Sequence, residues 1–185
     1  MTNKNKIIFV LIICQSIWMF PACNAGSREN NSFEYALIAG EKHEILKENI
    51  ICDMPYSVYE NETLCQALNF ELEDAKMIVE KCDSFFDPEY FLFDFDGDGL
   101  EDYLVSLAGA GHGGSGGNSV YIFLEGDVLK KVFDGTIRFA YSGEEGGYAP
   151  VMVLNEKTDG LYDIAFDGYD AIWQYSEQDG SYQRK

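Results

Sequence analysis

An acidic run from Asp94 to Asp102 constrains this 185-residue chain more than any other part of its sequence. The run reads Asp-Phe-Asp-Gly-Asp-Gly-Leu-Glu-Asp, so carboxylates stand at its first, third, fifth and ninth positions and a glycine at its sixth. A hard cation such as calcium takes about six to eight oxygen ligands, and a tight loop with glycine at this position can wrap them around it. The spacing therefore predicts a calcium site built from Asp94, Asp96, Asp98, Asp102 and the carbonyl of Leu100. The alternative is an acidic turn without metal, because Asp and Gly also suit tight turns.

The sequence around the acidic run differs from that of an EF-hand. The twelfth position, where an EF-hand carries a bidentate Glu, is Val105 here. The flanking segments 90–95 and 103–107 are rich in aromatic and branched apolar residues, which is typical of strands rather than helices. The run resembles the strand-loop-strand calcium loops of FG-GAP or VCBS-type repeats, in which an Asp at the ninth position completes the ligand set. That resemblance implies metal binding and no particular activity.

A wider part of the chain resembles small bacterial exported proteins and lipoproteins of uncharacterised activity that carry a single loop of this kind. The resemblance rests on the run 96–107, on the Gly-Gly-Ser-Gly-Gly of residues 113–117 and on the Val-Tyr-Ile-Phe of residues 120–123. It implies a shared fold and export, and it implies nothing about catalysis.

Residues 1–22 predict a signal peptide. Lys4 and Lys6 supply positive charge, residues 7–14 form an apolar core, and the segment ends with Phe20-Pro-Ala22. We expect this segment to be removed during export to the bacterial periplasm or cell envelope.

The residue that follows this segment, Cys23, is a candidate for lipidation. Cleavage after Ala25 without a lipid is the alternative. Residues 23–32 are small and polar and predict a tether, so the chain is expected to reach a membrane only through a lipid on Cys23.

The chain is strongly acidic, with a formal net charge of −19. Such a surface repels phosphate, so nucleic acid is excluded as a partner, whereas a basic protein is favoured. The alternative is that the charge serves solubility alone.

Residues 33–185 predict a single α+β domain, in which short N-terminal helices precede an antiparallel β-meander sheet. Its first part, residues 33–86, is expected to be mostly helical. Thr63 and Gln66 match a capping box, and apolar residues recur at helical spacing from Leu72 to Cys82. Segment 33–46 is expected to be helical as well.

The second part, residues 87–185, is expected to be β-rich and to contain the calcium loop. Short apolar runs alternate there with glycine-bearing turns, which is typical of an antiparallel meander. The runs are 90–95, 103–107, 119–124, 128–133, 151–154, 161–166 and 171–175. Tight turns are expected at Asp134-Gly, Asp159-Gly, Asp167-Gly and Asp179-Gly, since both residue types tolerate positive φ.

The three cysteines beyond Cys23 are Cys52, Cys65 and Cys82. An exported chain with an odd number of cysteines is expected to form one disulfide and leave one thiol over. Three pairings are open, and Cys65 with Cys82 is the one we favour.

The glycine-rich segment 109–118 matches catalytic patterns through its glycine content alone. A dinucleotide site would need a helix after the glycines, but the following residues predict a strand. A nucleophile elbow at Ser115 would need a later histidine, and His112 precedes it. We therefore expect a binding loop that presents Gly111, His112, Ser115 and Asn118.

These features favour an exported calcium-binding protein that is a non-enzymatic binding or scaffold module of the bacterial envelope. One alternative is a periplasmic inhibitor or immunity protein directed against a basic enzyme. Another is a hydrolase that uses Ser115 or a carboxylate pair, for which the candidates are Glu144 with Glu145 and Asp167 with Asp170.

Overall fold

The computed structural model describes residues 34–47, 50, 55–114, 117–137, 151–166 and 171–185. Residues Phe33–Lys185 make up one compact unit. The predictions for the signal peptide, the tether, Cys23, Cys52 and Ser115 lie outside the described residues.

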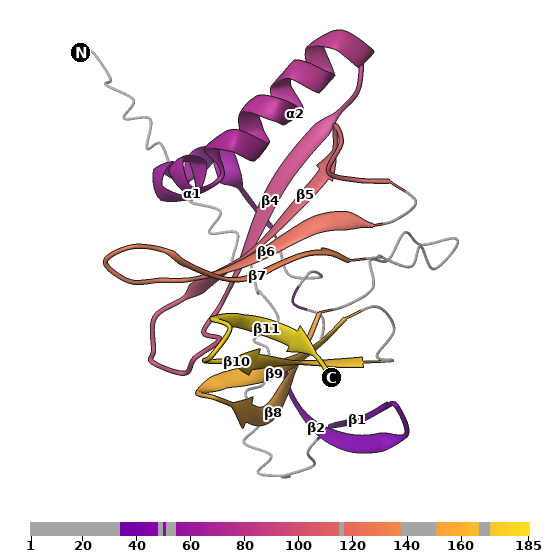
Figure 1. The fold of residues 1–185 in the computed structure, drawn as a ribbon, viewed down its shortest axis with the longest axis vertical. Helices are drawn as coiled ribbons and strands as arrows, with labels where there is room; N and C mark the ends of the chain where they lie inside the picture. The colour runs from indigo at the N-terminus through magenta and orange to yellow at the C-terminus, as the bar shows by residue number, and fades with distance from the viewer. Residues whose placement is uncertain (1–33, 48–49, 51–54, 115–116, 138–150, 167–170) are drawn as a thin grey trace, which may run out of the picture. The chain divides into compact units, whose positions relative to one another are not determined.

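The first of two sheets is an antiparallel meander whose strands follow one another in chain order (Figure 1). Its strands are β3 (Tyr56–Ser57), β4 (Phe86–Phe93), β5 (Asp102–Gly109), β6 (Asn118–Leu124) and β7 (Lys130–Ile137). A 3-10 helix η2 (Val58–Glu60) and two α-helices, α1 (Glu62–Ala67) and α2 (Asn69–Cys82), connect β3 to β4.

The second sheet joins the two ends of the described chain. Its strands are β1 (Tyr35–Ile38), β2 (Glu41–Lys47), β8 (Met152–Thr158), β9 (Leu161–Phe166), β10 (Ala171–Ser176) and β11 (Ser181–Arg184). Their order is β1-β2-β8-β9-β10-β11, and every pair is antiparallel. The strand β2 therefore pairs with β8, which follows it only after the entire first sheet.

The α+β prediction is wrong, because the fold is mostly β and has two antiparallel sheets. Segment 33–46, expected to be helical, contains the β1–β2 hairpin instead. Its turn is Ala39-Gly40, and both residues have positive φ, at 50° and 88°. Two such residues in succession give the turn that matches the twist of a hairpin. The apolar side chains of Ala36 and Ile38 face one buried cluster, which is strand periodicity.

The expected strands of the second part are present, although they belong to two sheets rather than one meander. Asp159-Gly160 makes the β8–β9 turn, with φ values of 49° and 95°, as predicted. Asp134-Gly135 does not turn, because both residues pair with β6 inside β7. The turn predicted at Asp167 lies outside the described residues.

Two helices form where the sequence predicts them, but the first is capped differently. The side chain of Asn61 accepts a hydrogen bond from the backbone N–H of Leu64 at 3.0 Å. Asn61 is therefore the N-cap, while Gln66 donates to Glu62 at 3.3 Å rather than closing a capping box. No described helix has the length and apolar character needed to cross a membrane.

The favoured disulfide is also wrong. Cys65 and Cys82 both carry free thiols. Cys65 lies in α1 and its thiol points to the carbonyl of Val58 at 3.3 Å, whereas Cys82 ends α2. A helix of this length separates the two residues by roughly 20 Å, far beyond the reach of a disulfide.

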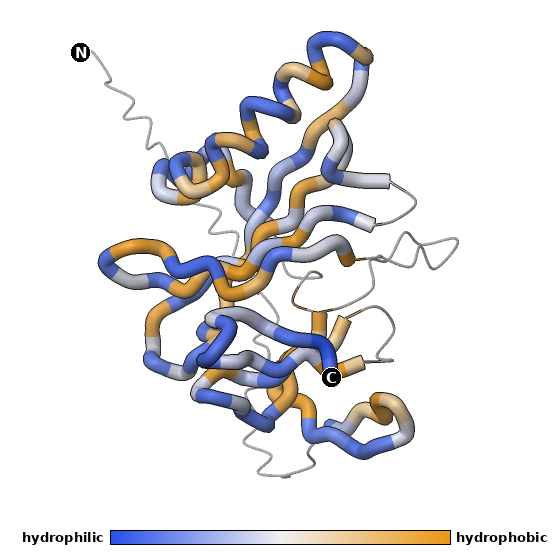
Figure 2. Tube along the Cα trace, in the orientation of Figure 1, coloured by the Kyte–Doolittle hydropathy of each residue, from blue (hydrophilic) through white to orange (hydrophobic). Residues whose placement is uncertain are grey.

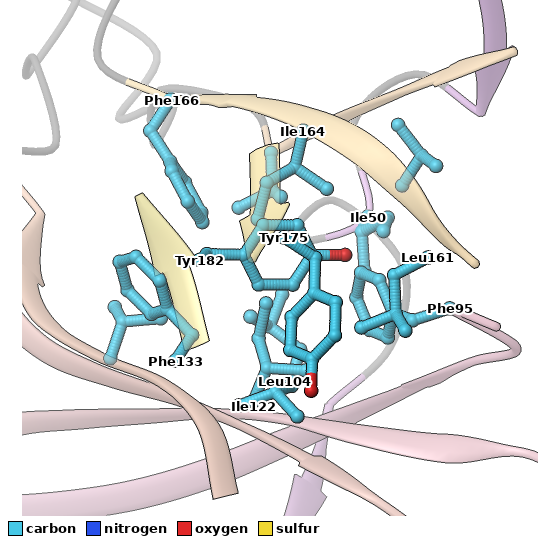
Figure 3. Packing of buried hydrophobic residues seen from close by; sticks show 14 of the residues in the cluster. Ile50, Phe95, Leu104, Ile122, Phe133, Leu161, Ile164, Phe166, Tyr175 and Tyr182 are labelled. Atoms are coloured by element: carbon cyan, nitrogen blue, oxygen red, sulfur yellow. The ribbon is translucent and has the colours of Figure 1, made fainter. Parts of the chain in front are cut away.

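The largest hydrophobic cluster draws side chains from both sheets. Figure 3 shows Leu104 and Ile122 of the first sheet in one cluster with Ile164 and Tyr175 of the second. A second cluster lies between the other face of the first sheet and the helices, and includes Leu64 of α1. Figure 2 shows this pattern along the chain: the central strands are hydrophobic, whereas hydrophobic and hydrophilic residues alternate along α2. The first sheet is thus covered on both faces.

Candidate metal centre

The acidic run forms the loop between β4 and β5. Phe93 is the last residue of β4 and pairs with Asp102, the first residue of β5. The loop residues Gly97 and Gly99 have φ values of 77° and 93°. Residues with a side chain rarely adopt such values, so the two glycines allow the chain to turn back within a few residues.

The first carboxylate of the loop, Asp94, organises the loop backbone. Its Oδ1 accepts hydrogen bonds from the N–H groups of Gly97 at 2.6 Å and Asp98 at 3.1 Å. Its Oδ2 accepts one from Gly99 at 3.0 Å. The side chain of Asp96 accepts in turn from the N–H of Asp98 at 3.0 Å. These short-range contacts curl the backbone around the acidic side chains.

The last carboxylate, Asp102, is buried, with 2% of its surface exposed. Its Oδ2 accepts a hydrogen bond from the N–H of Phe95 at 2.7 Å, and its Oδ1 accepts one from the N–H of Glu125 at 2.8 Å. Burial raises the pKa of Asp102 to about 6, and the charges of Asp96 and Asp94 add to that rise, while the two N–H groups oppose it. The raised pKa means that the surroundings of Asp102 disfavour its negative charge.

Three of the predicted ligands come together. Asp94, Asp96 and Asp102 each offer a carboxylate oxygen, and these oxygens lie within 4.8 Å of one another. Asp98 is exposed, is not part of this cluster, and turns its Oδ1 to the N–H of Leu100 at 2.8 Å. The roles of Asp98 and of the Leu100 carbonyl as ligands therefore stay predictions.

Two residues of the second sheet donate hydrogen bonds to the backbone of the acidic loop. The carbonyl of Phe95 accepts a hydrogen bond from the N–H of Tyr162 in β9 at 2.9 Å. The carbonyl of Asp96 accepts one from Nζ of Lys157 in β8 at 2.6 Å. The same ammonium lies 4.0 Å from the centre of the Tyr162 ring. The sequence alone did not reveal these contacts, because Lys157 and Tyr162 are distant in the chain and carry no local signal of a metal site.

The side chain of Phe95 anchors the loop in the core. It is fully buried, and its ring lies 5.1 Å from that of Phe93. The carboxylates of its neighbours Asp94 and Asp96 lie together with that of Asp102 instead. A buried aromatic side chain therefore stands within the acidic run, between two of its carboxylates.

The predicted binding loop lies after β5, at the opposite end of this strand from the acidic cluster. The N–H of His112 donates to the carbonyl of Gly109, and the N–H of Ser119 donates to the carbonyl of His112, both at 2.7 Å. A side chain at Gly109 would collide with the carbonyl of Phe85, so the glycine permits a close backbone approach. Gly111 is exposed, and Asn118 begins β6.

Of the residues suggested for a hydrolase together with His112, the structure describes only His112. Nδ1 of His112 lies 3.4 Å from the hydroxyl of Ser119, a strand residue. Ser115 lies outside the described residues, and so do both carboxylate pairs suggested for a hydrolase.

Comparisons of this chain with protein-family models, with curated proteins and with solved structures find no match.

Proposed function

We propose that this chain is a calcium-binding, non-enzymatic binding or scaffold module that is exported to the bacterial cell envelope. The observation that carries the proposal is the meeting of Asp94, Asp96 and Asp102, whose carboxylate oxygens lie within 4.8 Å of one another. Like charges held this close repel, and a divalent cation between them removes the repulsion.

The chemistry of the donors favours calcium over other metals. The cluster contains carboxylates and neither histidine nor cysteine, and an all-oxygen set suits calcium, magnesium or manganese rather than zinc or copper. Calcium tolerates irregular loops, whereas magnesium demands near-octahedral geometry and retains several waters. A short loop of consecutive residues is therefore better matched to calcium.

Calcium would stabilise the β4–β5 hairpin, which also leads to the glycine-rich loop. Asp102 begins β5 and Gly109 ends it, so the same strand connects the acidic cluster to the glycine-rich loop. An ion bound at the start of β5 would fix the β4–β5 hairpin and thereby the segment that presents Gly111 and His112. Loops presented by a rigid sheet commonly carry recognition.

Metal analysis tests this proposal. Protein purified in calcium-containing buffer and then passed through a desalting column should retain about one calcium per chain when the affinity is micromolar or better. The Asp96→Ala variant should retain far less, because it loses one of the three clustered carboxylates. Wild-type protein that carries no calcium above the level of Asp96→Ala would contradict the proposal.

The partner is proposed to be a basic protein, since the chain has a formal net charge of −19. Opposite charge accelerates association and makes it salt-dependent. Immobilised protein should therefore retain a basic protein from an envelope extract, and retention should fall as salt rises from about 0.05 to 0.5 M. Retention of a basic enzyme together with loss of its activity would identify the inhibitor form of this function. Retention that does not change with salt would argue against a charge-driven partner.

A further inference from the structure

A cavity of about 540 Å³ lies between α2 and β4, on the side of the first sheet that the helices cover. Aromatic and aliphatic side chains from three elements line it, namely Tyr59 of η2, Leu72 and Val79 of α2 and Phe86 of β4. Tyr59 is 60% exposed, so the cavity is open to solvent. In Figure 1, α2 runs alongside β4. Asn69 and Val79 both line the cavity, and ten residues of helix span about 15 Å, so the cavity is an elongated groove, the α2–β4 groove.

Helix α2 is packed incompletely against the sheet. Of its 14 residues, Ala75 alone is buried, although Leu72, Ala75 and Val79 stand at helical spacing. Leu72 and Val79 remain partly exposed at the wall of the groove. Phe70 and Met77, which helical geometry places on the neighbouring side of α2, are 79% and 45% exposed. The helix thus presents apolar surface that no described part of the chain covers, which is typical of an interaction site.

The rim of this groove is acidic. Each of the four aromatic and aliphatic residues that line the groove is followed in the chain by an exposed acidic residue, and these are Glu60, Glu73, Glu80 and Asp87. Segment 58–83, which contains η2 and both helices, has seven acidic and two basic residues. One of the two basic residues, Lys76, lines the groove. An apolar groove with such a rim favours an occupant that is both apolar and cationic, and it disfavours an anionic one such as a fatty acid.

The groove adjoins the glycine-rich loop. The ring of Phe86, which lines the groove, lies 5.7 Å from the imidazole of His112. Ile78 of α2 lies so close to Gly111 that a Cβ atom at Gly111 would stand 2.9 Å from its Cδ1. A partner that contacts the glycine-rich loop can therefore reach α2 as well.

We propose that the α2–β4 groove receives a basic amphipathic helix of the partner protein. The helix would insert its apolar side chains between Leu72, Val79 and Phe86, and its lysine or arginine residues would face the acidic rim. Apolar anchors one and two turns apart span about 5 to 11 Å, which fits a groove about 15 Å long. This inference rests on the proposed function for the basic nature of the partner, and it does not require a bound metal.

Fluorescence anisotropy with a labelled synthetic helix tests this inference. The probe is a peptide of lysine and leucine whose leucines form one apolar face, and it is titrated with the whole protein. We expect binding of one peptide per chain with a micromolar dissociation constant, and weaker binding as salt rises. A peptide of the same composition with scrambled order, and one with glutamate in place of lysine, should each bind about tenfold more weakly or less. Dodecanoate should not displace the probe.

Variants with matched controls locate the site. Val79→Trp should weaken binding about tenfold, because the larger side chain occupies the groove. Val128→Trp makes the same exchange at a residue that is 83% exposed between β6 and β7, and it should change binding less than about twofold. Glu73→Lys should weaken binding several-fold. Glu177→Lys makes the same charge change at an exposed position between β10 and β11, so its effect should be smaller.

The inference is overturned when the probe does not bind, when the scrambled or the acidic peptide binds equally well, or when Val79→Trp and Glu73→Lys bind the probe like their controls. A wild-type dimer that Val79→Trp dissociates in sedimentation would also overturn it, because the groove would then hold a second copy of the chain.

The same variants separate failure of this inference from failure of the proposed function. The residues that line the groove lie outside the acidic cluster, so Val79→Trp and Glu73→Lys should retain as much calcium as the wild type. A basic envelope protein that the wild type and Val79→Trp retain equally would support the proposed function and contradict the groove as its docking site.

Discussion

Calcium should raise the melting temperature of this protein by roughly 10 °C when its free concentration exceeds the dissociation constant about a thousandfold. An ion that binds only the folded state stabilises it by RT ln(1 + [L]/Kd), which is about 4 kcal/mol at this excess. For a chain of this size, each kcal/mol shifts the melting temperature by about 2–4 °C. Differential scanning calorimetry in a chelator and in excess calcium measures the shift. Magnesium at the same concentration should have a smaller effect.

The Asp96→Ala variant should lose most of that rise, since Asp96 is one of the three carboxylates that meet in the loop. Asp74→Ala is the matched control, because it removes an acidic side chain from α2, outside the cluster. It should keep the full response. An equal response of the wild type and Asp96→Ala to calcium would show that the ion stabilises the fold from another position.

Replacement of Phe95 by alanine should reduce the free energy of unfolding by about 3–5 kcal/mol, the usual cost of removing a buried aromatic ring. Phe95 is fully buried in the cluster shared by both sheets. Its backbone also connects the parts of the site, because its N–H donates to Asp102 and its carbonyl accepts from Tyr162. The cavity left by the ring would therefore loosen both the contact between the sheets and the support of the acidic loop.

Urea unfolding in calcium-free buffer measures this effect. Phe85→Ala is the control, because Phe85 is the same residue type just before β4 but is 68% exposed, so its replacement should cost less than about 1 kcal/mol. Similar losses for the two variants would mean that the ring of Phe95 does not support the core as described.

The parts of the fold that could be predicted from the sequence are those specified by neighbouring residues. Short apolar runs between turn residues predict the strands of residues 87–185, and apolar residues at helical spacing predict α2. The sequence does not predict the β1–β2 hairpin, because its turn is Ala39-Gly40 rather than an Asn-Gly or Asp-Gly pair. Charged residues in β2 also obscured its alternation.

The arrangement of the sheets could not be predicted in the same way. β2 pairs with β8, far along the chain, and nothing in the sequence of either strand marks the other as its partner. Two apolar-faced sheets and one continuous meander give similar local patterns, because both need alternating strands with turns between them. The choice between them depends on tertiary packing.

In the acidic site, too, the local contacts can be predicted from the sequence and the contacts with distant strands cannot. The curl of the loop is local, since Asp94 accepts hydrogen bonds from residues three to five positions later. The other hydrogen bonds to the acidic run come from residues far away in the chain, which are Glu125, Lys157 and Tyr162.

Anomalous scattering from a crystal grown in calcium tests the central claim most directly. Collected at long wavelength, the data should show one strong peak between Asp94, Asp96 and Asp102, with carboxylate oxygens at about 2.3–2.6 Å. The map would also show whether Asp98 and the Leu100 carbonyl complete the coordination. A well-ordered loop with no anomalous peak between the three aspartates would contradict the account.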